Sequence, residues 1–185
     1  MRLGLGLLIA LVLASVAQAA TTISFYSHGW GVGLNGYTYF PHAFVVIRRD
    51  SAAGEPPKVE RWGYTAQSVY DVGALLHPAP GEVSAPNETY RQHATLHFTV
   101  SITDDQYKAL EARIAWWGAP TSPLYHLDKH DCMTFVGDLA ATIGLKTGER
   151  TGRDPAKYLE QIKRLNADRI SPATEGEDSD QRMNR

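Results

Sequence analysis

The order of secondary-structure signals along the chain is the feature that most restricts its fold. Helical periodicity is confined to the second half of the sequence, where three helices are predicted: one from Thr103, one near Cys132 and one from Asp154. Segments rich in β-branched and aromatic residues come before them and predict strands at residues 21–26, 42–49, 58–65 and within 90–102. Because strands and helices do not alternate, the sequence predicts an α+β fold in which an antiparallel sheet packs against helices.

The connections between these segments refine the prediction. Residues 42–49 and 58–65 are joined by the turn-rich sequence DSAAGEPP, which favours an antiparallel hairpin. If its loop is centred near Gly54, Thr65 pairs opposite His42. Residues 73–88 contain three prolines and are expected to form a loop.

The three helices carry recognisable start and stop signals. Thr103 and Gln106 form a capping box, and Gly118 and Pro120 end that helix. The helix near Cys132 has an apolar stripe that ends at Gly144, and the third starts with an aspartate and a first-turn proline, Asp154-Pro155.

The two ends of the chain differ from the predicted domain, residues 20–170. Residues 1–19 contain an arginine, an apolar run and Ala-Gln-Ala, which is typical of a cleavable secretory signal and predicts a secreted or periplasmic protein. No later segment is apolar enough for a membrane span, so stable membrane insertion is not expected after cleavage. Residues 171–185 are expected to be a disordered acidic tail. The net charge of −2 argues against nucleic acid as a partner.

A glycine-rich segment follows the first predicted strand. Gly31, Gly33 and Gly36 match the spacing G-x-G-x-x-G, which in dinucleotide-binding proteins opens a helix. Here the glycines lead into aromatic residues and Pro41, so we interpret the segment as a flexible loop without a nucleotide cofactor.

Cys132 is the only cysteine, so no internal disulfide is possible. A lone cysteine is often a small buried hydrophobe, but this one falls in the first turn of a predicted helix. Unpaired backbone N–H groups and the helix dipole favour a thiolate there, whereas a nearby Asp131 carboxylate would oppose it.

A cysteine nucleophile needs a base, which is usually histidine. His42 begins the clearest strand and is the best candidate. His28 and His77 are expected to make surface or substrate contacts, and His93 and His97 to lie on an ordinary sheet surface. His126, His130 and Cys132 could ligate zinc, but the segment is predicted to be extended or turn-like and no fourth ligand follows, so no metal site is expected.

The segment from Tyr125 to Val136 resembles the Y-x-L-x-x-x-N-C-x-x-F-V signature of the circularly permuted NlpC-type papain-like proteins, which include the lecithin:retinol acyltransferase-like group. Tyr125, Leu127, Cys132, Phe135 and Val136 match by position, whereas Asp131 replaces the usual asparagine. The segment HAFVVI is similar to the family's histidine strand, and histidine before cysteine is the permuted order. The resemblance implies a permuted papain-like core.

The resemblance also implies a third polar residue on the next strand, which orients the histidine. The expected register favours Thr65, while Glu60, Arg61 and Tyr64 remain open; Glu60 is chemically the best partner but geometrically less favourable. Tyr125 could add a hydroxyl to the site, although packing is the more common role of such an aromatic residue.

These observations predict an exported cysteine hydrolase. Cys132 would attack a carbonyl, His42 would act as general base, and backbone N–H groups at the helix start would hold the oxyanion. Export and the resemblance favour amide bonds in peptidoglycan stem peptides as substrate. A lipid acyl hydrolase or acyltransferase and a non-catalytic exported binding module are the alternatives.

Overall fold

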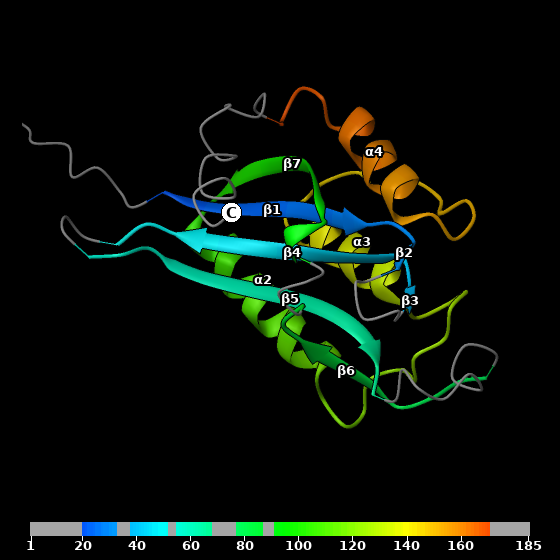
Figure 1. Ribbon diagram of the computed structural model, residues 1–185. Helices are drawn as coiled ribbons and strands as arrows, with labels where there is room; N and C mark the ends of the chain where they lie inside the picture. Colours follow the sequence, from blue (N-terminus) through cyan, green and yellow to red (C-terminus); the bar gives the residue numbers. More distant parts are fainter. Residues whose placement is uncertain (1–19, 33–37, 52–54, 68–76, 87–90, 171–185) are drawn as a thin grey trace, which may run out of the picture.

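The described part of the chain contains a five-stranded antiparallel sheet, a small two-stranded sheet and three helices (Figure 1). The computed structural model describes residues 20–32, 38–51, 55–67, 77–86 and 91–170. The sheet has the strand order β6-β5-β4-β1-β7 and is built from β1 (Thr21–His28), β4 (His42–Arg49), β5 (Lys58–Ala66), β6 (Gly81–Ser84) and β7 (Thr95–Ile102). The helices are α2 (Asp104–Trp117), α3 (Cys132–Thr142) and α4 (Pro155–Leu165). The α+β prediction is confirmed.

The helices cover one face of the sheet (Figure 1). Helix α3 packs against β4 and β5, and α4 packs against β1 and β7. Alternation along β4 directs Ala43, Val45 and Ile47 into the apolar core beneath the helices, while Phe44 stacks on Tyr26 on the other face. The arrangement, a helix that starts with cysteine packed on an antiparallel sheet, is consistent with a papain-like core.

Most predicted elements occur close to their expected positions. The strand 42–49 has the predicted bounds, and β1 and β5 run two residues and one residue further than expected. Two segments differ. The region 73–88 was expected to be a loop, but its residues Gly81–Ser84 form the edge strand β6, which pairs with β5. In the glycine-rich segment, β2 (Gly31–Val32) pairs with β3 (Thr38–Tyr39), and Gly33 and Gly36 lie outside the described residues.

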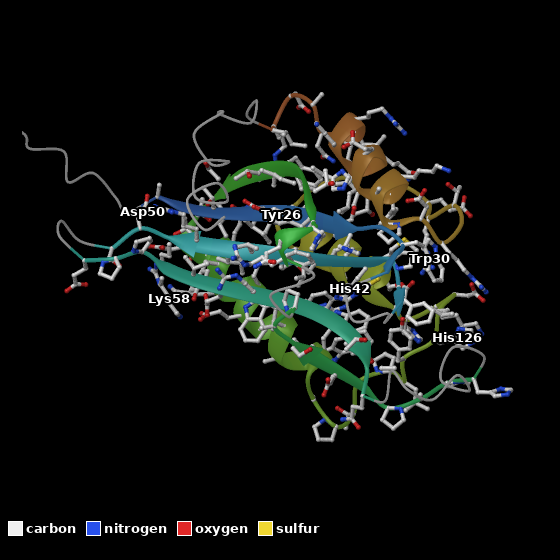
Figure 2. All side chains as sticks on the ribbon, viewed as in Figure 1. Tyr26, Trp30, His42, Asp50, Lys58 and His126 are labelled. Carbon is white, nitrogen blue, oxygen red and sulfur yellow. The ribbon has the colours of Figure 1, made fainter. Side chains whose placement is uncertain are left out.

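The β4–β5 hairpin fixes the register at the candidate site. Pairing runs from Arg49 with Lys58 to Phe44 with Gly63, as expected for a loop centred near Gly54. Continuing this register by two pairs places Thr65 across from His42. Figure 2 shows His42 and Trp30 at one end of the sheet, and Asp50 and Lys58 at the other.

The helix ends follow the local sequence. Thr103 and Gln106 form the predicted capping box of α2, and Asp154 caps α4 directly before Pro155. Gly144 has φ +81°, a left-handed conformation that suits glycine, one residue after the C-cap of α3. Among the described residues, no helix is both long and apolar enough to cross a membrane. The predicted signal, residues 1–19, and the predicted tail, residues 171–185, lie outside the described part of the chain.

Candidate active site

Cys132 is the first residue of α3, as the sequence predicts. Asp131 is the N-cap, and its carboxylate accepts a hydrogen bond of 3.0 Å from the backbone N–H of Thr134. The sulfur receives backbone N–H groups from Ala43 on β4 and from Met133 in its own helix. The thiol therefore lies between the start of α3 and the first residues of β4, and only 5% of Cys132 is exposed.

Burial controls the ionisation of this thiol. Desolvation, followed by the neighbouring Asp131 carboxylate, raises the pKa of Cys132 to about 12, although the two backbone N–H groups and Arg150 oppose the shift. The Met133 N–H at the helix start favours the thiolate and Asp131 opposes it, as expected, but burial outweighs the backbone N–H groups in the resting site. At neutral pH the resting cysteine is a thiol.

Arg150 connects the start of α3 to the chain between α3 and α4. Its guanidinium donates to the Asp131 carboxylate at 2.8 Å and to the carbonyl of Leu127 at 2.7 Å. Asp131 is only 3% exposed, yet burial still raises the pKa of its carboxyl despite hydrogen bonds from Thr134 and Arg150. The ion pair with Arg150 accounts for an aspartate at position 131, where the signature that this segment resembles has asparagine. The sequence gives no sign of it, because Arg150 is one of several arginines in polar segments.

His42 begins β4, and its ring lies against the neighbouring strand. A Cβ added to Gly63 would come within 2.7 Å of Nε2, so the imidazole occupies the space that a side chain at position 63 would need. His28 is its cross-strand partner on β1. Burial, followed by the nearby His28, lowers the pKa of His42 to about 4, so the imidazole is neutral at pH 7.

The residue after His42 supplies the link between the two predicted catalytic residues. Ala43 gives its N–H to the Cys132 sulfur, which brings the thiol to the end of β4 where His42 lies. Ala43 itself faces the helices, whereas the His42 ring stacks toward Phe44, with centroids 6.4 Å apart. The thiol and the imidazole thus share a strand end but lie on opposite faces of the sheet.

The candidates for a third polar residue are spread along β5. Tyr64 is buried toward the helices and donates its hydroxyl to the carbonyl of Pro123 at 2.7 Å. Glu60 accepts a 2.8 Å hydrogen bond from Tyr107 and pairs with Lys58 at 3.1 Å, far from His42 at the other end of the hairpin. Thr65, half-buried, pairs with Glu82 on β6.

Arg61 lies opposite Val46 in the β4–β5 ladder, four residues along β4 from His42. At about 3.3 Å of rise per residue, that separates the two positions by about 13 Å. Thr65 therefore remains the position that the register sets across from His42, and Gly63 is the residue that the imidazole contacts.

Tyr125 packs beside the site. It is buried, its ring centroid is 5.9 Å from that of Tyr64, and its backbone forms a bridge with Ala79. Burial raises the pKa of its hydroxyl above the usual value, with a further contribution from the charge of Cys132. The residue is thus close to the thiol and embedded in the aromatic core.

The remaining histidines divide into different environments. His126 and His130 form a backbone bridge, as expected for a turn-like approach to the helix, and His77 is exposed. His93 was expected on the third strand but lies before β7, with its ring 6.1 Å from that of His28. The prediction that His97 lies on an ordinary sheet surface is wrong, because it is buried and hydrogen-bonded to Ser27 and Glu160. In the described part of the chain, no group of three or more His, Cys, Asp or Glu residues could hold a metal ion.

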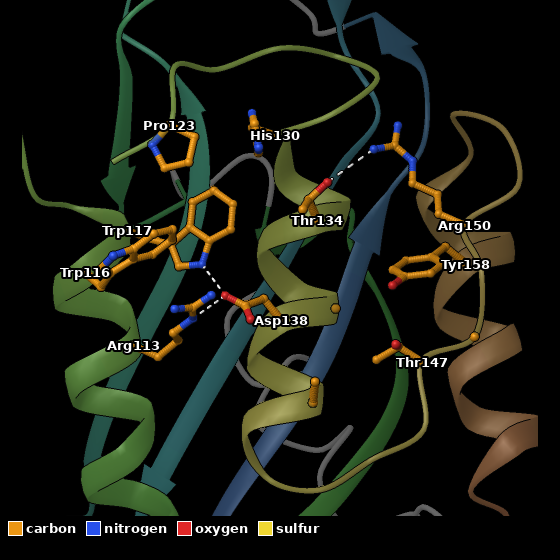
Figure 3. Close-up of a pocket in the computed structure, with 13 residues that line it drawn as sticks. Arg113, Trp116, Trp117, Pro123, His130, Thr134, Asp138, Thr147, Arg150 and Tyr158 are labelled. Atoms are coloured by element: carbon orange, nitrogen blue, oxygen red, sulfur yellow. Dashed lines mark hydrogen bonds and ion pairs between the residues drawn. The ribbon is translucent and has the colours of Figure 1, made fainter. Parts of the chain in front are cut away.

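A groove of about 410 Å³ lies along α3 (Figure 3). Its floor is the outer face of α3, formed by Thr134, Gly137, Asp138 and Ala141. Asp138 is held there by Arg113 and by the indole N–H of Trp117. Cys132 points from the opposite side of the helix into the core, so the thiol does not line this groove, although Arg150 and Thr134, which bond to Asp131, do.

Comparisons with known proteins give one structural likeness. No family model matches the chain, and no curated protein is significantly similar to it. The crystal structure of the type VI secretion system effector TseH matches with a TM-score of 0.49 and 16% identity, covering 84% of this chain and 98% of that one. A likeness of this size carries no argument about activity, so the chemistry is argued from the site itself.

Proposed function

We propose that the protein is a cysteine hydrolase that uses Cys132 as nucleophile and His42 as general base. The observation that carries the proposal is the contact between the Cys132 sulfur and the backbone N–H of Ala43, the residue next to His42. It places a thiol at a helix start beside the strand end where a histidine begins. Because the His42 ring lies with Phe44 on the other face of the sheet, the mechanism requires this ring to turn toward the sulfur. The resemblance of Tyr125 to Val136 to the permuted papain-like signature supports the same assignment.

The resting state sets the order of proton transfer. Both groups are neutral at pH 7, because burial raises the pKa of the thiol and lowers that of the imidazole. The thiol proton would pass to His42 as the sulfur attacks the substrate carbonyl. The imidazolium would then return it to the leaving amine as the thioester forms, and water would release the acyl group.

The start of α3 supplies candidates for oxyanion stabilisation. The first backbone N–H groups of a helix have no partner within it, and that of Met133 already points at the sulfur. A carbonyl carbon bound to the sulfur would place its oxygen near these donors. Backbone donors fixed in position stabilise the charge that develops in the transition state.

Amide bonds in peptidoglycan stem peptides are the proposed substrate. The secretory signal predicted at residues 1–19 would place the protein where this polymer is found. The resemblance to the NlpC-type group favours peptide cleavage over lipid chemistry. Residues 20–170 would form the catalytic domain.

The test uses purified peptidoglycan and mass spectrometry of the soluble fragments. The wild-type protein should release fragments with new amino and carboxyl termini, and Cys132→Ser and His42→Ala should abolish release. His77→Ala is the matched control, since His77 is exposed, and it should keep full activity. Equal release by wild type and Cys132→Ser would contradict the proposal. A fatty acyl adduct on Cys132 after incubation with phospholipid would replace the amide assignment with lipid acyl transfer.

One observation favours a second candidate, a non-catalytic exported binding module. Cys132 is almost fully buried and its thiol has a pKa raised to about 12, which also suits a structural cysteine. This candidate predicts that Cys132→Ser and the wild type bind peptidoglycan equally and that neither releases fragments.

A further inference from the structure

A chain of three polar side chains runs beneath the sheet near Cys132. The Ser27 hydroxyl lies 2.7 Å from Nε2 of His97, and Nδ1 of the same ring lies 2.8 Å from the Glu160 carboxylate. The residues come from β1, β7 and α4. Ser27 is 4% and His97 7% exposed, whereas the Glu160 side chain is 42% exposed. The chain therefore leads from the surface of α4 into the core.

An irregularity in β7 creates this arrangement. Phe98 pairs with Phe25 and Leu96 pairs with Tyr26, which leaves His97 as an extra residue without a partner on β1. Such a bulge re-aims a side chain that simple alternation would send to the other face. Here it turns His97 toward α4, where Glu160 meets the ring.

The contact with Glu160 fixes the direction of the hydrogen bonds. An ionised carboxylate only accepts, so Nδ1 carries the proton and donates it to Glu160. In the neutral ring, Nε2 is then the acceptor, and the Ser27 hydroxyl donates to it. The Ser27 oxygen keeps lone pairs that can accept a proton from another donor.

Cys132 lies one strand away from this oxygen. Ser27 is the cross-strand partner of Ala43, and the N–H of Ala43 contacts the Cys132 sulfur. Directly opposed residues on antiparallel strands have side chains on the same face. Ser27 therefore points to the helix-covered face on which the thiol also lies.

We propose that Ser27, His97 and Glu160 form a proton-accepting chain for the Cys132 thiol. The inference rests on the proposed function, to which it adds a second acceptor. In the step, the S–H bond breaks and its proton forms a bond to the Ser27 oxygen, directly or through one water molecule. The original Ser27 proton moves to Nε2 of His97. The products are a thiolate and an imidazolium that is hydrogen-bonded to the Glu160 carboxylate, so no charge is created or lost overall.

Ser27 would take the thiol proton, His97 would accept the proton that Ser27 gives up, and Glu160 is a positioning residue because it acts through the His97 ring. The titratable and charged groups around the thiol are Asp131 at the α3 N-cap, Arg150 beyond α3 and Tyr125 before it. Around His97 they are Glu160 on α4 and the hydroxyl of Ser27 on β1. A pH profile of Cys132 reactivity must therefore be compared among single variants of these groups.

The test measures alkylation of Cys132 by iodoacetamide as a function of pH in the full-length protein, with the adduct quantified by mass spectrometry. Ser27→Ala, His97→Gln and Glu160→Gln should each shift the alkylation profile to higher pH, and His97→Gln should slow the reaction at neutral pH by at least about tenfold. Ser24→Ala is the matched control. Ser24 is buried on the same strand and bonds to Thr99 at 2.8 Å, and its loss should leave the profile unchanged.

The outcomes separate this inference from the proposed function. A merely structural chain would loosen when broken and expose the sulfur, so alkylation that is faster or unchanged in His97→Gln would overturn the inference. If alkylation depends on His42 and not on His97, the proposed function stands and the inference fails. A native wild-type thiol that does not react at any pH up to about 10 contradicts both.

Discussion

The N-termini of α2 and α3 are stabilised in different ways. At α2, the Thr103 hydroxyl accepts from the backbone N–H of Gln106 at 3.2 Å, and the Gln106 side chain accepts from the N–H of Thr103 at 2.9 Å. At α3, the Asp131 carboxylate caps the helix and is itself held by Arg150, 19 residues further along the chain. The first cap is exposed and the second is buried.

This difference shows what is special about the start of α3. A local cap such as that of α2 can form in an isolated segment, because its donors and acceptors are three residues apart. The cap of α3 needs the chain between α3 and α4 to be in place. The position of Cys132 is thus tied to tertiary structure, and the charge beside its thiol is tied to Arg150.

The largest expected effect comes from breaking the α3 pair. Arg150→Met removes the partner of a carboxylate that is 3% exposed and should lower the free energy of unfolding by about 3–5 kcal/mol, because it leaves a buried charge uncompensated. Urea denaturation measures this change. Arg153→Met is the matched control, since Arg153 pairs with Asp128 at an exposed site and its loss should barely move the urea midpoint. Similar midpoints for the two variants would show that the α3 cap does not depend on Arg150.

A second effect concerns reactivity. Asp131→Asn keeps a capping acceptor and restores the residue type of the resembling signature, but it removes the negative charge that raises the pKa of Cys132. The thiol pKa should fall, and a fall of one unit would increase the thiolate population about tenfold at neutral pH. The ultraviolet absorbance of the thiolate, followed during pH titration, reports the change. An unchanged titration would mean that the Asp131 charge does not act on the sulfur.

The same substitution tests the pH dependence of stability. Burial raises the pKa of Asp131 in the folded state, so folding favours its protonated form. As the pH falls from neutrality through the raised folded pKa, the wild type should gain stability relative to Asp131→Asn, and the gain should end below the unfolded value of about 3.9. Unfolding free energies of both proteins at matched pH values measure it. A loss of wild-type stability relative to Asp131→Asn as the pH falls would contradict this prediction.

The smallest expected effect is at α2. Thr103→Ala removes one side of the capping box and should cost about 1 kcal/mol in urea denaturation. Because Gln106 of the α2 cap donates to the carbonyl of Ile143, at the opposite end of α3 from Cys132, alkylation of the thiol should be unchanged. A change in thiol reactivity as large as that in Asp131→Asn would remove the distinction between the two caps.

Local signals were sufficient to predict most of the fold. The β-branched run after His42 gave the bounds of β4, and the turn composition around Gly54 gave the register of the hairpin. The capping box at Thr103 and the proline after Asp154 located two helices. The edge strand β6 was missed because it is short and lies among prolines, and edge strands tolerate such residues.

The candidate site was predictable only in part. The position of Cys132 followed from its helix, and that of His42 from its strand. The hydrogen bond from Arg150 to Asp131 could not be predicted, because it depends on the conformation of the loop between α3 and α4. The burial of His97 could not be predicted either, because it depends on a bulge in β7 that the alternation of residues does not reveal. The ionisation of the thiol also escaped prediction, since the desolvation that outweighs the helix terminus comes from tertiary packing around the sulfur.

Reaction with p-nitrophenyl acetate tests the central claim most directly, because this activated ester requires a nucleophile and a base but no specific recognition. The wild type should release nitrophenolate in a burst of about one equivalent per chain and carry an acetyl group on Cys132, identified by mass spectrometry. His42→Ala should slow the burst by about a hundredfold or more while leaving the fold intact by circular dichroism. A burst of the same rate in wild type and His42→Ala, or no acetyl group on Cys132 in the folded wild-type protein, would contradict the assignment of Cys132 and His42 as nucleophile and base.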